Sequence, residues 1–213
     1  MARDDSPPFG RGQTFYDGAS IDSNNLGGAQ HEGKIWVFED LDYTNSGAKP
    51  QRSNRPVKCM CVRNVGAAAM LPKRLATLKR SGLNFLGQVD GYGDITAEAN
   101  AFPIDEWLPA AGVPVNDLFW IVIEGPAMCL TPIGTGEFNG NIANGQNLVA
   151  LTAATSGATT AGRVACENIT GSSAATDYTF LSDQILNRIG QAISARTTGE
   201  TNSAILINVM NHL

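Results

Sequence analysis

The sequence predicts a mainly β protein, a barrel or a sandwich, with at most one or two short helices. Short runs of β-branched and aromatic residues are separated by turn-forming Gly, Pro and Asn, and the 213-residue chain contains 23 glycines. Its hydrophobic content of 43% with 16% charged residues is typical of a folded protein rather than a disordered one. We expect roughly eight to ten short strands.

Residues 1–33 are predicted to form an extended N-terminal arm, and residues 34–213 a β-rich domain with a possible subdivision near residue 132. The arm is dense in Gly, Pro, Asn, Asp and Ser and has neither a helical nor a strand period. A disordered tail seldom carries several aromatic residues. Those of the arm are Phe9, Phe15 and Tyr16. We expect them to anchor the arm on a neighbouring subunit or on a larger assembly.

Alternating and apolar patterns predict the strands of the domain. The expected strands are 33–41, 55–65, 85–95, 147–153, 162–169, 189–195 and 204–210. The last four are expected to form two hairpins, because short turn-rich segments separate them. Residues 71–82 fit either a short amphipathic helix or an extended segment, and residues 104–117 a helical turn or a loop.

The most apolar short stretch is "VNDLFWIVIEGP", residues 115–126. It is far shorter than the eighteen or more apolar residues that a membrane-spanning helix needs. Its length and its Phe, Trp, Ile and Val content are typical of a central strand buried on both faces. We therefore expect Trp120 and Ile121 in the core. A bend at Gly125-Pro126 is expected to begin a second strand.

The cysteine and histidine patterns predict neither a catalytic centre nor a metal site nor a cofactor. Cys59 and Cys61 would share one face of a strand, and no second ligand pair accompanies them. They are expected to be reduced, buried and metal-free. His31 and His212 are isolated, which disfavours a His-based triad. The N-terminus lacks the apolar segment of a signal peptide, so we expect synthesis in the cytoplasm without export.

The charges fall into three zones. Residues 1–42 carry a net charge of −5, residues 43–89 carry nine basic and no acidic side chains, and residues 90–213 carry −9. The isoelectric point near 5.0 argues against a nucleic-acid partner. Folding could interleave the zones. Alternatively, the basic zone docks on an acidic surface of a neighbour, with Arg52, Arg55, Lys73 and Arg74 as interface candidates.

The acidic residues provide the alternative of an enzyme. Asp105 and Glu106 are adjacent, so on a regular element they diverge rather than face one space, as a carboxylate pair must for acid–base chemistry. A capping or solvated role is therefore expected for both. A hydrolase using Asp105, Glu106 or Glu124 is the alternative, and a strongly raised carboxyl pKa within a pocket would favour it.

Three segments in order carry a family resemblance: "VRNVGAAAMLPKRL", "GYGDITAEANAFPIDEWLP" and "IGQAISARTTGETNSAILINVM". With them the chain, over roughly residues 55–213, resembles the small virion proteins that decorate the heads of tailed bacteriophages. The N-terminal arm lies outside this resemblance.

The resemblance implies a non-catalytic decoration, or cement, protein that binds and stabilises a viral capsid lattice. The expected partners are the major capsid protein and further copies of the chain, in a symmetric homo-oligomer for which a trimer is favoured. The protein would be located on the capsid surface of the virion. Another phage component (a capsid subunit, a fibre or a tail protein) is the alternative within the same class.

Overall fold

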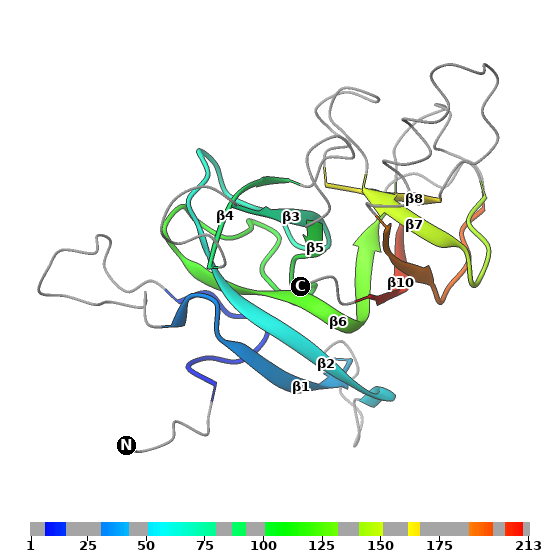
Figure 1. The fold of residues 1–213 in the computed structure, drawn as a ribbon, viewed down its shortest axis with the longest axis horizontal. Coiled ribbons are helices and arrows are strands. Elements are labelled where there is room, and N and C mark those ends of the chain that lie inside the picture. Colours follow the sequence, from blue (N-terminus) through cyan, green and yellow to red (C-terminus); the bar gives the residue numbers. More distant parts are fainter. Residues whose placement is uncertain are drawn as a thin grey trace, which may run out of the picture.

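The fold is a single sheet of two long and eight shorter strands, seen in a computed structural model that describes most of the chain (Figure 1). The described residues are 7–15, 31–42, 51–79, 87–92, 101–131, 141–150, 162–166, 188–197 and 203–210. They contain ten strands and no α-helix, hence no helix able to span a membrane. The predicted all-β class is confirmed, and the strand count agrees with the expected range.

The strands follow the order of the predicted segments. They are β1 (Ile35–Leu41), β2 (Gln51–Asn64), β3 (Leu75–Leu78), β4 (Gln88–Tyr92), β5 (Ala101–Pro103), β6 (Leu118–Leu130), β7 (Asn147–Ala150), β8 (Val164–Cys166), β9 (Arg188–Ala192) and β10 (Ala204–Val209). Both expected hairpins are present, because β7 pairs antiparallel with β8 and β9 with β10. Residues 75–78 are extended rather than helical, and residues 104–117 form turns.

The sheet runs in the order β5-β3-β4-β2-β6-β10-β9-β7-β8, and β1 pairs with β2 beside this path. Neighbouring strands are antiparallel except β2 and β4, which are parallel over a short register. The sheet curves into a nearly closed barrel, with β1 and β2 extending from it as a ribbon (Figure 1). Of the barrel and the sandwich, the barrel is the better description.

Strand β6 links the two parts of the sheet by changing partner at Gly125. Its residues Leu118–Glu124 pair with β2, and Gly125–Leu130 pair with β10. Gly125 has a φ of 99°, and a Cβ there would lie 2.5 Å from the carbonyl oxygen of Pro56, so only glycine fits. The predicted bend is therefore present, but one continuous strand passes through it instead of two separate strands.

Residues 57–64 of β2 and most of β6 are buried on both faces, and their alternating side chains supply two hydrophobic clusters. One cluster includes Val57, Cys59, Cys61, Trp120 and Val122, and it extends to β9 and β10. The other includes Met60, Val62, Phe119, Ile121 and Ile123, and it is covered by the segment from Phe102 to Val113. Trp120 and Ile121 are both fully buried, as the sequence predicts.

Trp120→Ala should lower the free energy of unfolding by about 3–5 kcal/mol, because it removes the largest fully buried side chain of the described residues. The indole also packs on Phe9, at 5.0 Å between ring centroids, and on Phe38, at 5.2 Å. Urea denaturation measures the change, with Val115→Ala at an exposed turn as the control. A loss below about 1 kcal/mol would contradict the core position.

Candidate functional site

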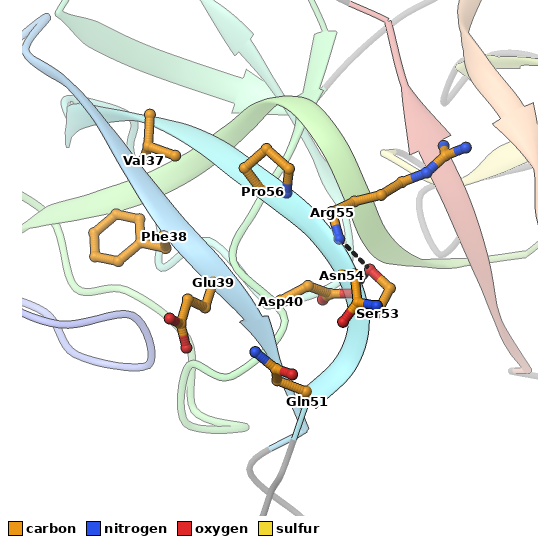
Figure 2. Close-up of a pocket in the computed structure, with 9 residues that line it drawn as sticks. All are labelled: Val37, Phe38, Glu39, Asp40, Gln51, Ser53, Asn54, Arg55 and Pro56. Atoms are coloured by element: carbon orange, nitrogen blue, oxygen red, sulfur yellow. Dashed lines mark hydrogen bonds between the residues drawn. The ribbon is translucent and has the colours of Figure 1, made fainter.

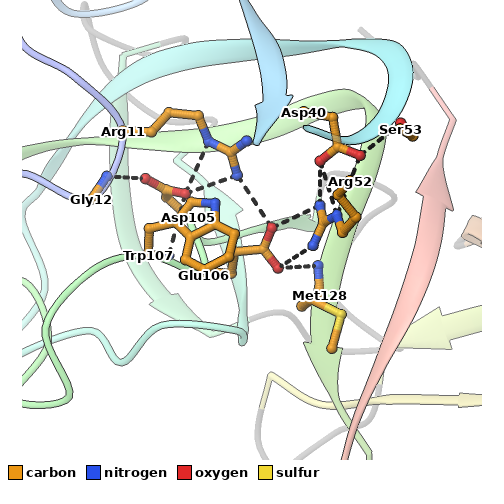
Figure 3. Close-up of polar contacts among 9 residues, drawn as sticks. All are labelled: Arg11, Gly12, Asp40, Arg52, Ser53, Asp105, Glu106, Trp107 and Met128. Carbon is orange, nitrogen blue, oxygen red and sulfur yellow. Dashed lines mark hydrogen bonds and ion pairs between the residues drawn. The ribbon is translucent and has the colours of Figure 1, made fainter. Parts of the chain in front are cut away.

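A buried cluster of ion pairs lies where five parts of the chain meet (Figure 3). They are the N-terminal segment 7–15, β1, β2, β6 and the turn after β5. Asp105 is fully buried and accepts hydrogen bonds from Arg11 through Nε, at 3.1 Å, and Nη2, at 3.0 Å. The backbone N–H of Gly12 donates to its other oxygen at 2.6 Å. The carboxylate therefore holds residues 11 and 12 against a turn that lies more than ninety positions later.

The second half of the cluster is centred on Arg52. Its guanidinium contacts Asp40 at 2.6 Å and Glu106 at 2.8 Å, and it lies 6.0 Å from the ring centroid of Trp107. Ser53 donates a hydrogen bond to Asp40 at 2.7 Å. Through these contacts β1, β2 and the turn are tied together.

Glu106 joins the two halves. It lies 3.5 Å from Arg11 as well as against Arg52, and it accepts a hydrogen bond from the backbone N–H of Met128 at 3.0 Å. The cluster holds three carboxylates and two guanidinium groups, so one negative charge is not matched within it. Burial disfavours the charged form of Glu106 and raises its pKa, although the hydrogen bond from Arg52 acts in the opposite direction.

Of the capping or solvated role predicted for Asp105 and Glu106, the solvated role is wrong. Both carboxylates do accept hydrogen bonds from backbone N–H groups, Asp105 from Gly12 and Glu106 from Met128. Both acidic residues are buried. They lie in a turn rather than on a helix or strand, so their side chains need not diverge and both enter one cluster of arginines. Glu124, the third carboxylate of the enzyme alternative, forms an exposed ion pair with Lys58 at 2.6 Å. The two buried carboxylates thus hold segments of the chain together, whereas the exposed pair of Glu124 contributes little to stability.

The N-terminal segment 7–15 packs on its own domain. Phe9 is buried, and its carbonyl accepts a hydrogen bond from Trp120 Nε1 at 3.2 Å. Phe15 exchanges two backbone hydrogen bonds with Leu118, of 3.0 and 2.9 Å, while its ring stays partly exposed. The ring of Phe9 thus belongs to the protein's own core, and the anchoring of the arm on a neighbour stays a prediction. Tyr16 lies outside the described residues.

The four basic interface candidates have different surroundings. Arg52 belongs to the ion cluster. Lys73 has a φ of 60°, and its carbonyl accepts a hydrogen bond from Leu130, whereas Arg74 lies 5.0 Å from the ring centroid of Tyr92. Arg55 alone among the four is classed as exposed, and it donates to Asn208 at 3.3 Å. Of this set, Arg55 is the best placed to meet a partner.

Arg55 and Pro56 form a ridge between two hollows. The hollow on one side, of about 310 Å³, opens between β1 and β2, where β2 has extra residues opposite Asp40 (Figure 2). Its lining mixes apolar Val37 and Pro56 with polar Glu39, Gln51 and Asn54. The other, of about 440 Å³, lies between β2, β6 and β10 and includes Glu124 and Asn208. This ridge was not predicted from the sequence, because it depends on the partner change of β6.

Cys59, Cys61 and Cys129 are buried, and for Cys59 and Cys61 this burial is as predicted. Cys59, Cys61 and Cys129 form no disulfide, and burial raises the pKa of Cys61 to about 12 and that of Cys129 well above its usual value. Within the described ranges, no group of three or more His, Cys, Asp or Glu residues is arranged to hold a metal ion. Such thiols pack as small apolar side chains.

No protein-family model and no curated protein matches the chain. Among solved structures, the chain is similar to the N base of the head fibre gp8.5 of bacteriophage phi29, at 11% sequence identity and a TM-score of 0.36. That match covers 71% of this chain and 92% of the phage chain.

Arg11→Ala should destabilise the protein by about 3–5 kcal/mol, because it leaves Asp105 buried with its main countercharge removed. Arg55→Ala is the matched control and should change the stability by less than about 0.5 kcal/mol, since Arg55 is exposed. Chemical denaturation of both variants measures the difference. Equal stabilities would show that the N-terminal segment is not attached through Arg11.

The raised pKa of Glu106 predicts a pH dependence of a definite sign. A carboxyl group whose pKa is higher in the folded than in the unfolded state binds its proton more tightly when folded. Its stabilising contribution is present below the ordinary value of 4.5 and is lost as the pH rises through the folded-state value.

Wild type should therefore lose stability relative to Glu106→Gln as the pH rises above about 4.5. Denaturation of both proteins across the acidic range gives the unfolding free energy of wild type minus that of Glu106→Gln at each pH. The contributions of the other carboxylates cancel in this difference. A difference that increases with pH would contradict a Glu106 pKa raised by burial.

Proposed function

We propose that the chain is a structural protein of a bacteriophage virion, which binds and stabilises the capsid lattice as a decoration protein. The proposal is carried by the exposed Arg55–Pro56 ridge with a hollow on each side. A basic side chain between two shallow recesses suits a protein partner whose side chains enter the recesses and whose acidic groups meet Arg55.

The scaffold supports this role. Residues from five separate segments are fixed by the buried ion cluster, which sets the relative positions of β1, β2 and β6 around the ridge. A binding surface built on strands that are held in this way is already ordered before it meets a partner, which lowers the entropic cost of binding. The resemblance of residues 55–213 to head-decorating proteins points to the capsid as that partner.

Sedimentation with assembled capsids tests the proposal. The purified chain is incubated with heads of the virus that encodes it, assembled without this protein, and the pelleted heads are imaged by cryo-electron microscopy. We expect bound density at symmetry-related positions of the lattice. A chain that stays in the supernatant, or that appears only at one vertex or on the tail, would contradict decoration and favour a fibre or tail component.

Arg55→Glu tests whether the ridge is the contact surface. Reversing an exposed charge should reduce head occupancy by at least about tenfold, while leaving the fold intact. Lys79→Glu reverses a basic charge of the same sequence zone outside the two hollows and should retain binding. Equal occupancy of heads by the two variants would exclude the ridge.

A further inference from the structure

We propose that two copies of this protein associate through the outer edge of β1, by antiparallel pairing across a two-fold axis. Within the described part of the chain, β1 pairs with β2 on one side and with no strand on the other. Its unpaired edge is at the margin of the ribbon that β1 and β2 form (Figure 1). An open edge presents backbone donors and acceptors that another strand can pair with.

The three strands that end the described sheet differ in length. β5 and β8 have three residues each, whereas β1 has seven. Short edge strands offer few backbone groups and resist pairing, and so do edges that carry Pro or Lys. The β1 sequence "IWVFEDL" contains neither of these residues. β1 is therefore the edge most suited to accept a further strand.

The exposed face of β1 carries two apolar side chains beside Glu39. Ile35 is 49% exposed and Val37 is 62% exposed, while the opposite face directs Trp36 and Phe38 toward the core. Two β-branched residues at alternate positions on an open edge strand favour the addition of a neighbouring strand against which they can pack. In a monomer these two side chains stay largely exposed, so their apolar surface contributes little to stability.

The charges at the ends of β1 select a second copy, in the antiparallel direction. Exposed Lys34 precedes the strand, and exposed Glu39 lies near its end. An antiparallel partner with the same sequence brings the basic end of each copy to the acidic end of the other. Parallel pairing would place like charges together, which is destabilising. The strand is thus complementary to itself, as a two-fold interface requires.

The register follows from the part of β1 that pairs regularly. Its pairing with β2 is regular from Ile35 to Glu39 and shifts afterwards, so Val37 is the middle residue. A two-fold axis at Val37 sets the two Val37 side chains opposite each other and each Ile35 opposite a Glu39. The exposed faces of the two sheets then become continuous. This arrangement gives a dimer in place of the trimer favoured by the sequence analysis.

Sedimentation velocity of the full chain at concentrations up to about 100 µM tests the dimer, because this range detects dissociation constants up to about 100 µM. We expect a concentration-dependent monomer–dimer equilibrium. Val37→Lys should raise the dissociation constant at least about tenfold, since a lysine on the edge opposes a lysine of its copy. Val115→Lys makes the same change at an exposed turn position outside β1 and should leave the constant within about twofold of wild type.

A charge exchange provides the sharper test. Lys34→Glu should weaken the dimer, because it puts an acidic group beside the acidic end (Glu39 and Asp40) of the copy. The double variant Lys34→Glu/Glu39→Lys should recover only part of the loss, because Glu39 faces Ile35 of the copy and not Lys34 in this register. A monomer at all concentrations, a trimer, equal effects of Val37→Lys and Val115→Lys, or a Lys34→Glu variant that dimerises as tightly as wild type would each overturn the proposal. The measurement needs no capsid, so its failure would leave decoration untouched.

Discussion

The partner change of β6 at Gly125 is the constraint on which the other features depend. A strand that pairs with β2 over its first half and with β10 over its second must turn away from β2. The close approach of Pro56 leaves no room for a side chain at the turning point. Beyond that point β2 continues with β1 alone, and the wedge that opens between β2, β6 and β10 becomes one of the two hollows.

The ion cluster supports the region that this divergence weakens. Where β2 leaves β6, Arg52 and Ser53 return to Asp40 and Glu106, and Glu106 reaches the backbone of β6 beyond the turn at Met128. Polar contacts take the place of strand pairing there. Removing five charged groups from water is costly, and the cluster offsets this by giving most of its oxygen atoms a donor. A uniquely fixed geometry of the surface above it is the result.

The strand pattern could be predicted from the sequence, because alternation and turn residues are local signals. The Val57–Val62 run and the apolar stretch around Trp120 identify their strands without knowledge of any partner. The cluster could not be predicted in this way. Asp105 and Arg11 are 94 residues apart, and nothing in either neighbourhood indicates the other. The positions of Arg52 and Glu106 depend likewise on how β2 bows opposite Asp40, which is a property of the assembled sheet.

The distance in sequence between the N-terminal segment and its contacts has a consequence for synthesis. Phe9 and Arg11 leave the ribosome long before Asp105 and Trp120, which lie 94 and 111 residues after their respective partners. At ordinary translation rates this is an interval of roughly 5 to 20 s. During it the nascent chain exposes an aromatic ring with no pocket to enter. Folding of the segment must therefore wait for the middle of the protein, so Phe9 and Arg11 become ordered well after they are made.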